Sequence, residues 1–441
     1  MAWRTWASVC LANLVGLSAC SSNGTSAADG GSSSAAVQVF ASQKARLSAA
    51  SVPAADVLAA AQANNQFGLT AYQALKDLQP SGNALFSPYS AEVALAMTAQ
   101  GAKGETLTQM QKTLAFSLPA AQMHPAFGAL DLALMSRGSG AAGKDGQPFR
   151  LKIANSTWGQ KGFPFVEAFL DGLKVNYGAG MNAVDFEQDA EAARLAINSW
   201  VLAATEKKIK DLIPKGAVDN LTRLVLVNAI YFNAAWEKPF NPQATLPGPF
   251  TTLAGKSVSV PRMVQTAMFG YASSADWQAL ELRYDGGEIA MLIVLPGAGK
   301  LVAVENTLSA AQLKAIVAQL TPSNTRVTLP KWQLDWSAPL VNVLQGMGMT
   351  AAFEPAQADL SGIGGSKGEL FITAVLQKTF IGVDERGTEA AAATAVIVGT
   401  TSAPPPPIDF TADRPFVYVI RDVATEAVLF VGRVGDPSVG I

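Results

Sequence analysis

The chain has 441 residues, of which 49% are hydrophobic, so it is long and apolar enough to bury a sizeable core. Its 32 basic and 34 acidic residues leave a net charge of −2 without a Lys/Arg stripe, which argues against a nucleic-acid partner. The one histidine, His124, removes most routes to a His-dependent catalytic centre or a zinc site. The composition therefore argues against an enzyme, and we expect neither a metal nor a cofactor.

The N-terminus has the features of an export signal. Arg4 precedes a mostly apolar run, Trp6–Ala19, whose roughly 14 residues are too few to span a bilayer of about 30 Å. The run ends in Leu17-Ser18-Ala19-Cys20, which resembles the lipobox of bacterial lipoproteins, where the cysteine is lipidated and becomes the first residue. Ser21 then favours the outer membrane over the inner one. The alternative is an ordinary signal peptide that is cut near Ala19 to Ser22.

Composition divides the chain into three segments. We expect a lipoprotein signal peptide at residues 1–19, lipidated Cys20 with a flexible Ser/Ala/Gly tether at 20–54, and one folded domain at 55–441. Both cysteines, Cys10 and Cys20, lie near the N-terminus, so no disulfide is expected in the folded part. The protein should be a monomer that is exported and either lipid-anchored at the bacterial outer membrane or cell surface, or secreted.

The periodicity of apolar residues predicts a mixture of helices and strands in the folded part. In chain order we expect helices at 62–78 and 90–101, strands at 221–232 and 288–295, helices at 306–320 and 336–346, and a strand region at 418–431. The regular alternation of a doubly wound parallel fold is missing, so the fold class is α+β.

Six separated motifs in this order resemble the serpin family. They are Asn83–Ser90, Asn198–Val201, Leu221–Phe240, Asp359–Gly362, Val383–Glu389 and Ala412–Phe416. The resemblance runs from about residue 58 to the C-terminus. It implies one domain with a large central β-sheet, two smaller sheets, about eight or nine helices and an exposed reactive-centre loop. It also implies an inhibitor of serine-type endopeptidases.

A serpin inhibits as a suicide substrate: the protease begins to cut the exposed loop, and the cut loop inserts into the sheet before the acyl-enzyme can hydrolyse. The resemblance assigns the loop hinge to Glu385, Gly387, Thr388, Glu389, Ala390, Ala391, Ala392 and Ala393. With a period of two, Thr388 and the even-numbered residues that follow it up to Val398 share one uncharged face, while Glu389 lies on the other. An uncharged face suits burial beneath a sheet. In isolation, the alanine run would indicate a flexible loop or a helix.

The family spacing places the reactive bond between Thr401 and Ser402, with Thr400 and Val398 as alternatives. The small residues around it suit elastase-like or subtilisin-like proteases. No Lys or Arg occurs between Gly387 and Asp413, so trypsin should not be a target.

The resemblance also implies a polar gate beneath the parting sheet, formed by Ser87, Ser90, Asn228 and Gln377. The family usually has a histidine where this chain has Gln377, which could bond Asn228 but cannot titrate near neutral pH. Trp236 resembles the tryptophan at the point where the loop enters the sheet. The alternative readings are a buried polar cluster that only aids folding and a tryptophan that is simply core.

Two other functions compete with inhibition. One is a non-inhibitory serpin-fold surface binding protein. The other is a hydrolase, which a single histidine and the lack of a G-x-S-x-G motif make the weakest reading.

Overall fold

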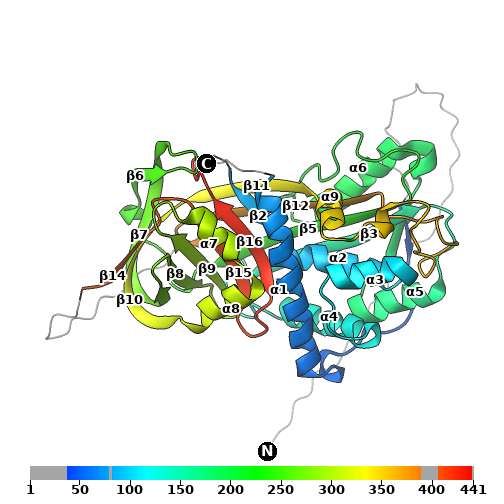
Figure 1. The fold of residues 1–441 in the computed structure, drawn as a ribbon, viewed down its shortest axis with the longest axis horizontal. Helices are drawn as coiled ribbons and strands as arrows, with labels where there is room; N and C mark the ends of the chain where they lie inside the picture. Colours follow the sequence, from blue (N-terminus) through cyan, green and yellow to red (C-terminus); the bar gives the residue numbers. More distant parts are fainter. Residues whose placement is uncertain (1–36, 79–81, 389–405, 440–441) are drawn as a thin grey trace, which may run out of the picture. The chain divides into compact units, whose positions relative to one another are not determined.

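The computed structural model describes residues 37–78, 82–388 and 406–439. Within these ranges, nine α-helices and sixteen strands in two sheets form an α+β domain (Figure 1). The predicted fold class is confirmed.

A seven-stranded sheet carries the segments that matter for function. Its order is β1 (Gln38–Phe40), β4 (Met181–Val184), β3 (Arg150–Gln160), β5 (Leu224–Ala235), β12 (Ala374–Val383) and β11 (Trp332–Pro339), and β13 (Gly387–Thr388) also pairs with β5. In its middle, β5 and β12 run parallel, from the Val225–Ala374 pair to the Tyr231–Phe380 pair. We call this β5–β12 boundary the seam.

The second sheet has nine strands. Its order is β14 (Ile408–Thr411), β10 (Thr321–Pro330), β7 (Ser257–Ser273), β8 (Trp277–Arg283), β9 (Ile289–Pro296), β15 (Phe416–Asp422), β16 (Val428–Val434) and β2 (Ala84–Phe86), and β6 (Leu246–Thr251) pairs with β7. We expected two smaller sheets. The 17-residue strand β7 joins them, because one end pairs with β6 and the other with β8.

Helices cover both faces of the seven-stranded sheet. The helices of the described residues are α1 (Ala54–Lys76), α2 (Pro88–Ala99), α3 (Gly104–Thr113), α4 (Ala120–Met135), α5 (Glu167–Gly172), α6 (Phe186–Ala204), α7 (Leu301–Thr307), α8 (Ala310–Ala318) and α9 (Val341–Gly346), of which α7 and α8 lie by the second sheet. Leu226 and Ile230 of β5 face the main core, which includes α2, whereas Val225 and Val227 pack with α6. Asn228 therefore points toward α2. Every residue of α2 is buried.

Two predicted elements differ from the observed ones. Residues 336–346 were expected to be a helix, but Trp336 lies in β11 and only Val341–Gly346 is helical. Trp332 and Leu334 are buried and Gln333 is exposed, so the period there is two. The predicted helix at 306–320 is two helices, because Ser309 begins a new one by accepting a hydrogen bond from the Gln312 N–H.

The predicted tether also ends earlier than residue 54. Residues 37–54 pack on the domain: β1 pairs with β4, and the Phe40 ring lies 5.3 Å from that of Phe165. Arg46 forms a 2.6 Å ion pair with Asp131 on α4. Among the described residues, no single helix is long and apolar enough to cross a membrane; the bent pair α7–α8 passes by length and composition only.

The histidine lies in the core. The His124 Nδ1 atom is 2.7 Å from the hydroxyl of Tyr177, and burial lowers the pKa of His124 to about 4. The imidazole is therefore neutral at physiological pH, as expected for a packing residue.

Candidate functional site

The hinge begins as a tight turn at the end of β12. The Asp384 N–H donates to the Gly387 carbonyl at 3.0 Å, and the Arg386 N–H donates to Asp384 Oδ1 at 3.0 Å. Gly387 has φ of +143°, and a Cβ atom there would lie 2.2 Å from the carbonyl oxygen of Ala234. Only glycine fits this turn without a backbone shift.

After the turn, the chain runs back along β5. Gly387 pairs with Ala235 and Thr388 with Ala234, both antiparallel. Thr388 is buried, and its hydroxyl lies 3.0 Å from the hydroxyl of Tyr284. The remaining predicted loop residues, Glu389, Ala390, Ala391, Ala392, Ala393, Val398, Thr400, Thr401 and Ser402, lie outside the described residues, as does Cys20.

Trp236 holds the hinge from the end of β5. Its backbone N–H donates to the Arg386 carbonyl at 2.9 Å, and its indole N–H donates to the Asp384 carbonyl at 3.0 Å. The indole stacks on Tyr284 with ring centroids 4.5 Å apart. Burial raises the pKa of Tyr284 far above its usual value, so the phenol that meets Thr388 stays neutral.

Glu385 ties the turn to the second sheet. Its carboxylate accepts from the Thr245 hydroxyl at 2.8 Å and pairs with Lys331 Nζ at 3.0 Å, and its carbonyl accepts from the Phe240 N–H at 2.7 Å. Burial alone would raise the pKa of Glu385. Hydrogen bonds from its own backbone, from Thr245 and from Lys331 outweigh burial and lower that pKa below its ordinary value.

The gate residues meet beneath the middle of the seam. Gln377 lies directly across the seam from Asn228. The glutamine could have bonded the Asn228 amide, but the structure shows no hydrogen bond between the two side chains. Gln377 Oε1 instead accepts from the Ser87 N–H at 2.9 Å, and Gln377 Nε2 donates to the Ser87 carbonyl at 2.9 Å. Ser87 precedes α2, where its backbone offers a donor and an acceptor that β12 can reach.

The Asn228 side chain is fully buried, and neither its amide oxygen nor its amide nitrogen has a partner among the described residues. Its neighbour Asn155, directly opposite on β3, accepts from the Ser90 hydroxyl at 2.6 Å, but its own amide nitrogen is also unpaired. The sequence analysis missed Asn155, because only the strand pairing reveals its place beside Asn228.

Comparisons with known proteins agree with this geometry. The family model described as serpin (serine protease inhibitor) matches residues 62–437. Leukocyte elastase inhibitor A of Rattus norvegicus is 38% identical over 384 residues, which cover 85% of this chain and 98% of the relative. Antithrombin-III of Mus musculus is 36% identical over 386 residues, or 86% of this chain and 82% of the relative.

Solved structures give the same result. Serpin48 of the insect Tenebrio molitor superposes with a TM-score of 0.74 at 32% identity, covering 86% of this chain and 98% of the insect chain. Human thyroxine-binding globulin complexed with thyroxine superposes with a TM-score of 0.77 at 27% identity, covering 87% and 99%. From its motifs, its fold and these matches, the chain belongs to the serpin family.

Proposed function

We propose that the protein inhibits serine endopeptidases as a suicide substrate rather than acting as a catalyst. A protease would cut the loop that follows Thr388, form an acyl-enzyme, and be trapped when the cut loop inserts into the seam. One observation carries this proposal: Gly387 and Thr388 already pair with β5 at the hinge end of the seam, in the antiparallel direction that insertion needs.

The observed register predicts where an inserted loop would lie. Each step beyond Thr388 moves one residue back from Ala234 along β5. Six steps bring Thr394 opposite Asn228, and ten bring Val398 opposite Leu224, the first residue of β5. The uncharged even-numbered face would then be buried with Thr388 on the α2 side.

Insertion has a favourable energy source. The seven direct residue pairs of the seam, Val225–Ala374 to Tyr231–Phe380, must separate. An inserted strand would replace this one parallel interface by two antiparallel ones, which have better hydrogen-bond geometry. The intact protein would thus be a kinetically trapped form, as the mechanism requires.

The target class follows from two features. Relatives of this chain are named leukocyte elastase inhibitors. The residues around the predicted bond Thr401–Ser402 are small, and no Lys or Arg lies between Gly387 and Asp413. Both support an elastase-like or subtilisin-like target, held covalently by a monomeric inhibitor.

The test is a panel of elastase-like, subtilisin-like and trypsin-like proteases with purified protein. We expect an SDS-stable complex with the first or second class only, a cut mapped by mass spectrometry near Thr401, and a cleaved form that melts well above the intact one. Cleavage without a complex would favour the second candidate, a binding protein. That candidate draws support from thyroxine-binding globulin, a chain of the same fold that was solved with thyroxine bound.

We also propose export and lipidation at Cys20, supported by the Leu17–Cys20 pattern and by the Ser/Ala/Gly segment after it. In a bacterial host, the protein should fractionate with the outer membrane, and Cys20→Ala should release it or block its processing. If both forms are soluble after export, an ordinary signal peptide explains the N-terminus instead.

A further inference from the structure

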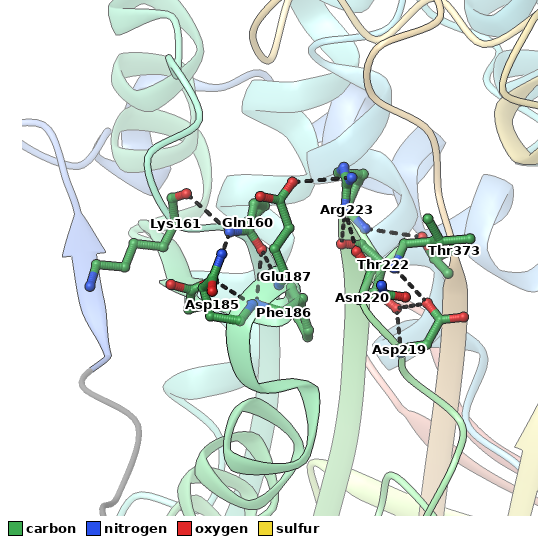
Figure 2. Close-up of polar contacts among 12 residues, drawn as sticks. Gln160, Lys161, Asp185, Phe186, Glu187, Asp219, Asn220, Thr222, Arg223 and Thr373 are labelled. Carbon is green, nitrogen blue, oxygen red and sulfur yellow. Dashed lines mark hydrogen bonds and ion pairs between the residues drawn. The ribbon is translucent and has the colours of Figure 1, made fainter.

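The end of the seam opposite the hinge holds a cluster of polar side chains (Figure 2). Gln160 at the end of β3 joins the start of α6: its Oε1 accepts from the N–H groups of Phe186 and Glu187 at 2.8 and 3.2 Å. Its Nε2 donates to Asp185 Oδ1 at 3.1 Å. Asp185 in turn caps α6 by accepting from the Gln188 N–H. These contacts fix α6 to β3.

Arg223, just before β5, continues the cluster on the same side of the seam. Its guanidinium pairs with Glu187 Oε1 at 3.1 Å and donates to the carbonyls of Asn220 and Thr222 at 3.0 and 3.1 Å. Figure 2 shows the Arg223 side chain between Glu187 and the Asp219–Thr222 turn. All these partners belong to α6 or to the chain that leads into β5, so they can move as one body with β5.

Thr373 contacts Arg223 from the other side of the seam. Thr373 precedes β12, and its hydroxyl oxygen accepts a hydrogen bond from the backbone N–H of Arg223 at 3.3 Å (Figure 2). Its own N–H donates to the Leu224 carbonyl at 3.0 Å. The Arg223–Thr373 bond is therefore a side-chain contact that crosses the seam at its far end.

We propose that Thr373 is a positioning residue for inhibition, a latch that holds the far end of the seam closed and sets the rate at which an inserting strand completes its path. This inference rests on the proposed function. An inserted strand that extends as far as Leu224 lies between β5 and β12 at that end of the seam. It adds one strand spacing, so the distance between these two backbones grows from about 5 to about 10 Å. The Arg223–Thr373 bond consequently exists only in the closed form.

Thr373→Val tests the latch, because valine keeps the branched shape and removes the acceptor. The rate to measure is that at which a synthetic peptide with the sequence of residues 388–401 anneals into the uncleaved full chain, followed on native gels and by the rise in melting temperature. We expect Thr373→Val to anneal about fivefold faster, since a net hydrogen bond is worth about 1 kcal/mol. Thr373→Ser, which restores the hydroxyl, should anneal at the wild-type rate.

Glu187→Gln is the matched control, because it weakens the Arg223 ion pair on one side of the seam and leaves the crossing bond in place. It should not change the annealing rate. A wild-type rate for Thr373→Val, or equal acceleration by Glu187→Gln, would overturn the latch. So would a wild-type chain that never accepts the peptide, which would overturn strand insertion as well.

A protease assay separates this inference from the proposed function. With a protease that the protein inhibits, Thr373→Val should lower the number of inhibitor molecules consumed per protease. The association rate, which depends on how the protease recognises the loop sequence, should stay the same. Faster peptide annealing without any protease complex would support the latch and contradict the inhibitory function. Protease complexes with every variant, together with unchanged annealing rates, would support the inhibitory function and contradict the latch.

Discussion

The hinge and the gate both border the strand β5, but they differ in how well their polar groups are paired. At the hinge, the Trp236 indole, the Glu385 carboxylate and the Thr388 hydroxyl all have partners within 3.0 Å. At the gate, both amide atoms of Asn228 and the amide nitrogen of Asn155 are buried without a partner among the described residues. The start of the loop is thus fixed in register, while the middle of the seam is held less well.

This difference has an energetic meaning. A buried polar group without a hydrogen bond costs about 1–3 kcal/mol, and such groups are rare in native structures. Here they lie where the sheet would have to part. Strain at functional sites persists because the surrounding structure holds it.

The largest effect is expected from a substitution at the hinge. Thr388→Arg places a charge on the buried face beside Tyr284, where an unpaired ion costs several kcal/mol. We expect the yield of SDS-stable complex to fall by more than about tenfold, a factor worth about 1.4 kcal/mol, while cleavage continues. Thr388→Ser keeps the hydroxyl and should inhibit normally. Undiminished complex formation by the arginine variant would show that this position does not enter the sheet.

A second variant tests the turn itself. In Gly387→Ala, the new methyl group would lie 2.2 Å from the Ala234 carbonyl oxygen at φ of +143°, so the turn must shift. We expect the intact protein to lose about 1–3 kcal/mol of stability, measured by denaturant unfolding. Gly382→Ala in β12 is the matched control, because the nearest atoms to its Cβ lie 3.9 Å away. Equal losses in both variants would mean that the hinge turn is not special.

Period-two alternation predicts that Thr388 lies on the face that is buried after insertion, and in the intact structure Thr388 is already buried. The same alternation was overlooked in another strand. The same alternation at Trp332 and Leu334 marks β11, yet the region around Trp336 was read as helix, because apolar spacing there fits both periods. Composition alone predicted a tether at 20–54, although Phe40 and Arg46 anchor part of this segment to the domain.

The hydrogen-bond partners at the gate could not be predicted from the sequence. The motifs brought Gln377 and Asn228 to opposite sides of one seam. The partner of Gln377 is the backbone of Ser87, which every residue type possesses and no sequence pattern marks. Asn155 was missed for a related reason, since its position opposite Asn228 depends on the register of two strands about 70 residues apart.

A third variant tests whether the unpaired Asn228 amide at the gate gains a partner after insertion. If insertion keeps the register of Thr388, the Thr394 hydroxyl arrives at Asn228 and can bond an amide that is unpaired in the closed form. Thr394→Val should destabilise the loop-cleaved protein by about 1 kcal/mol and leave the intact protein unchanged, as measured by denaturant unfolding of each form. Thr394→Ser should behave as wild type. An unchanged cleaved form would mean that the loop inserts in another register.

The smallest expected effect concerns pH and the hinge. The pKa of Glu385 is lowered from its ordinary value of 4.5 in the folded protein, so its contribution to stability is present above pH 4.5 and is lost as the pH falls through the lowered folded value. Glu385→Gln should therefore melt below wild type near pH 7, and the two melting curves should converge as the pH drops below 4.5. Because Lys331 is partly exposed, added salt should narrow the gap at neutral pH. A gap that persisted unchanged in acid would show that glutamine disturbs the turn by its shape, and that the charge of Glu385 contributes nothing to holding the hinge.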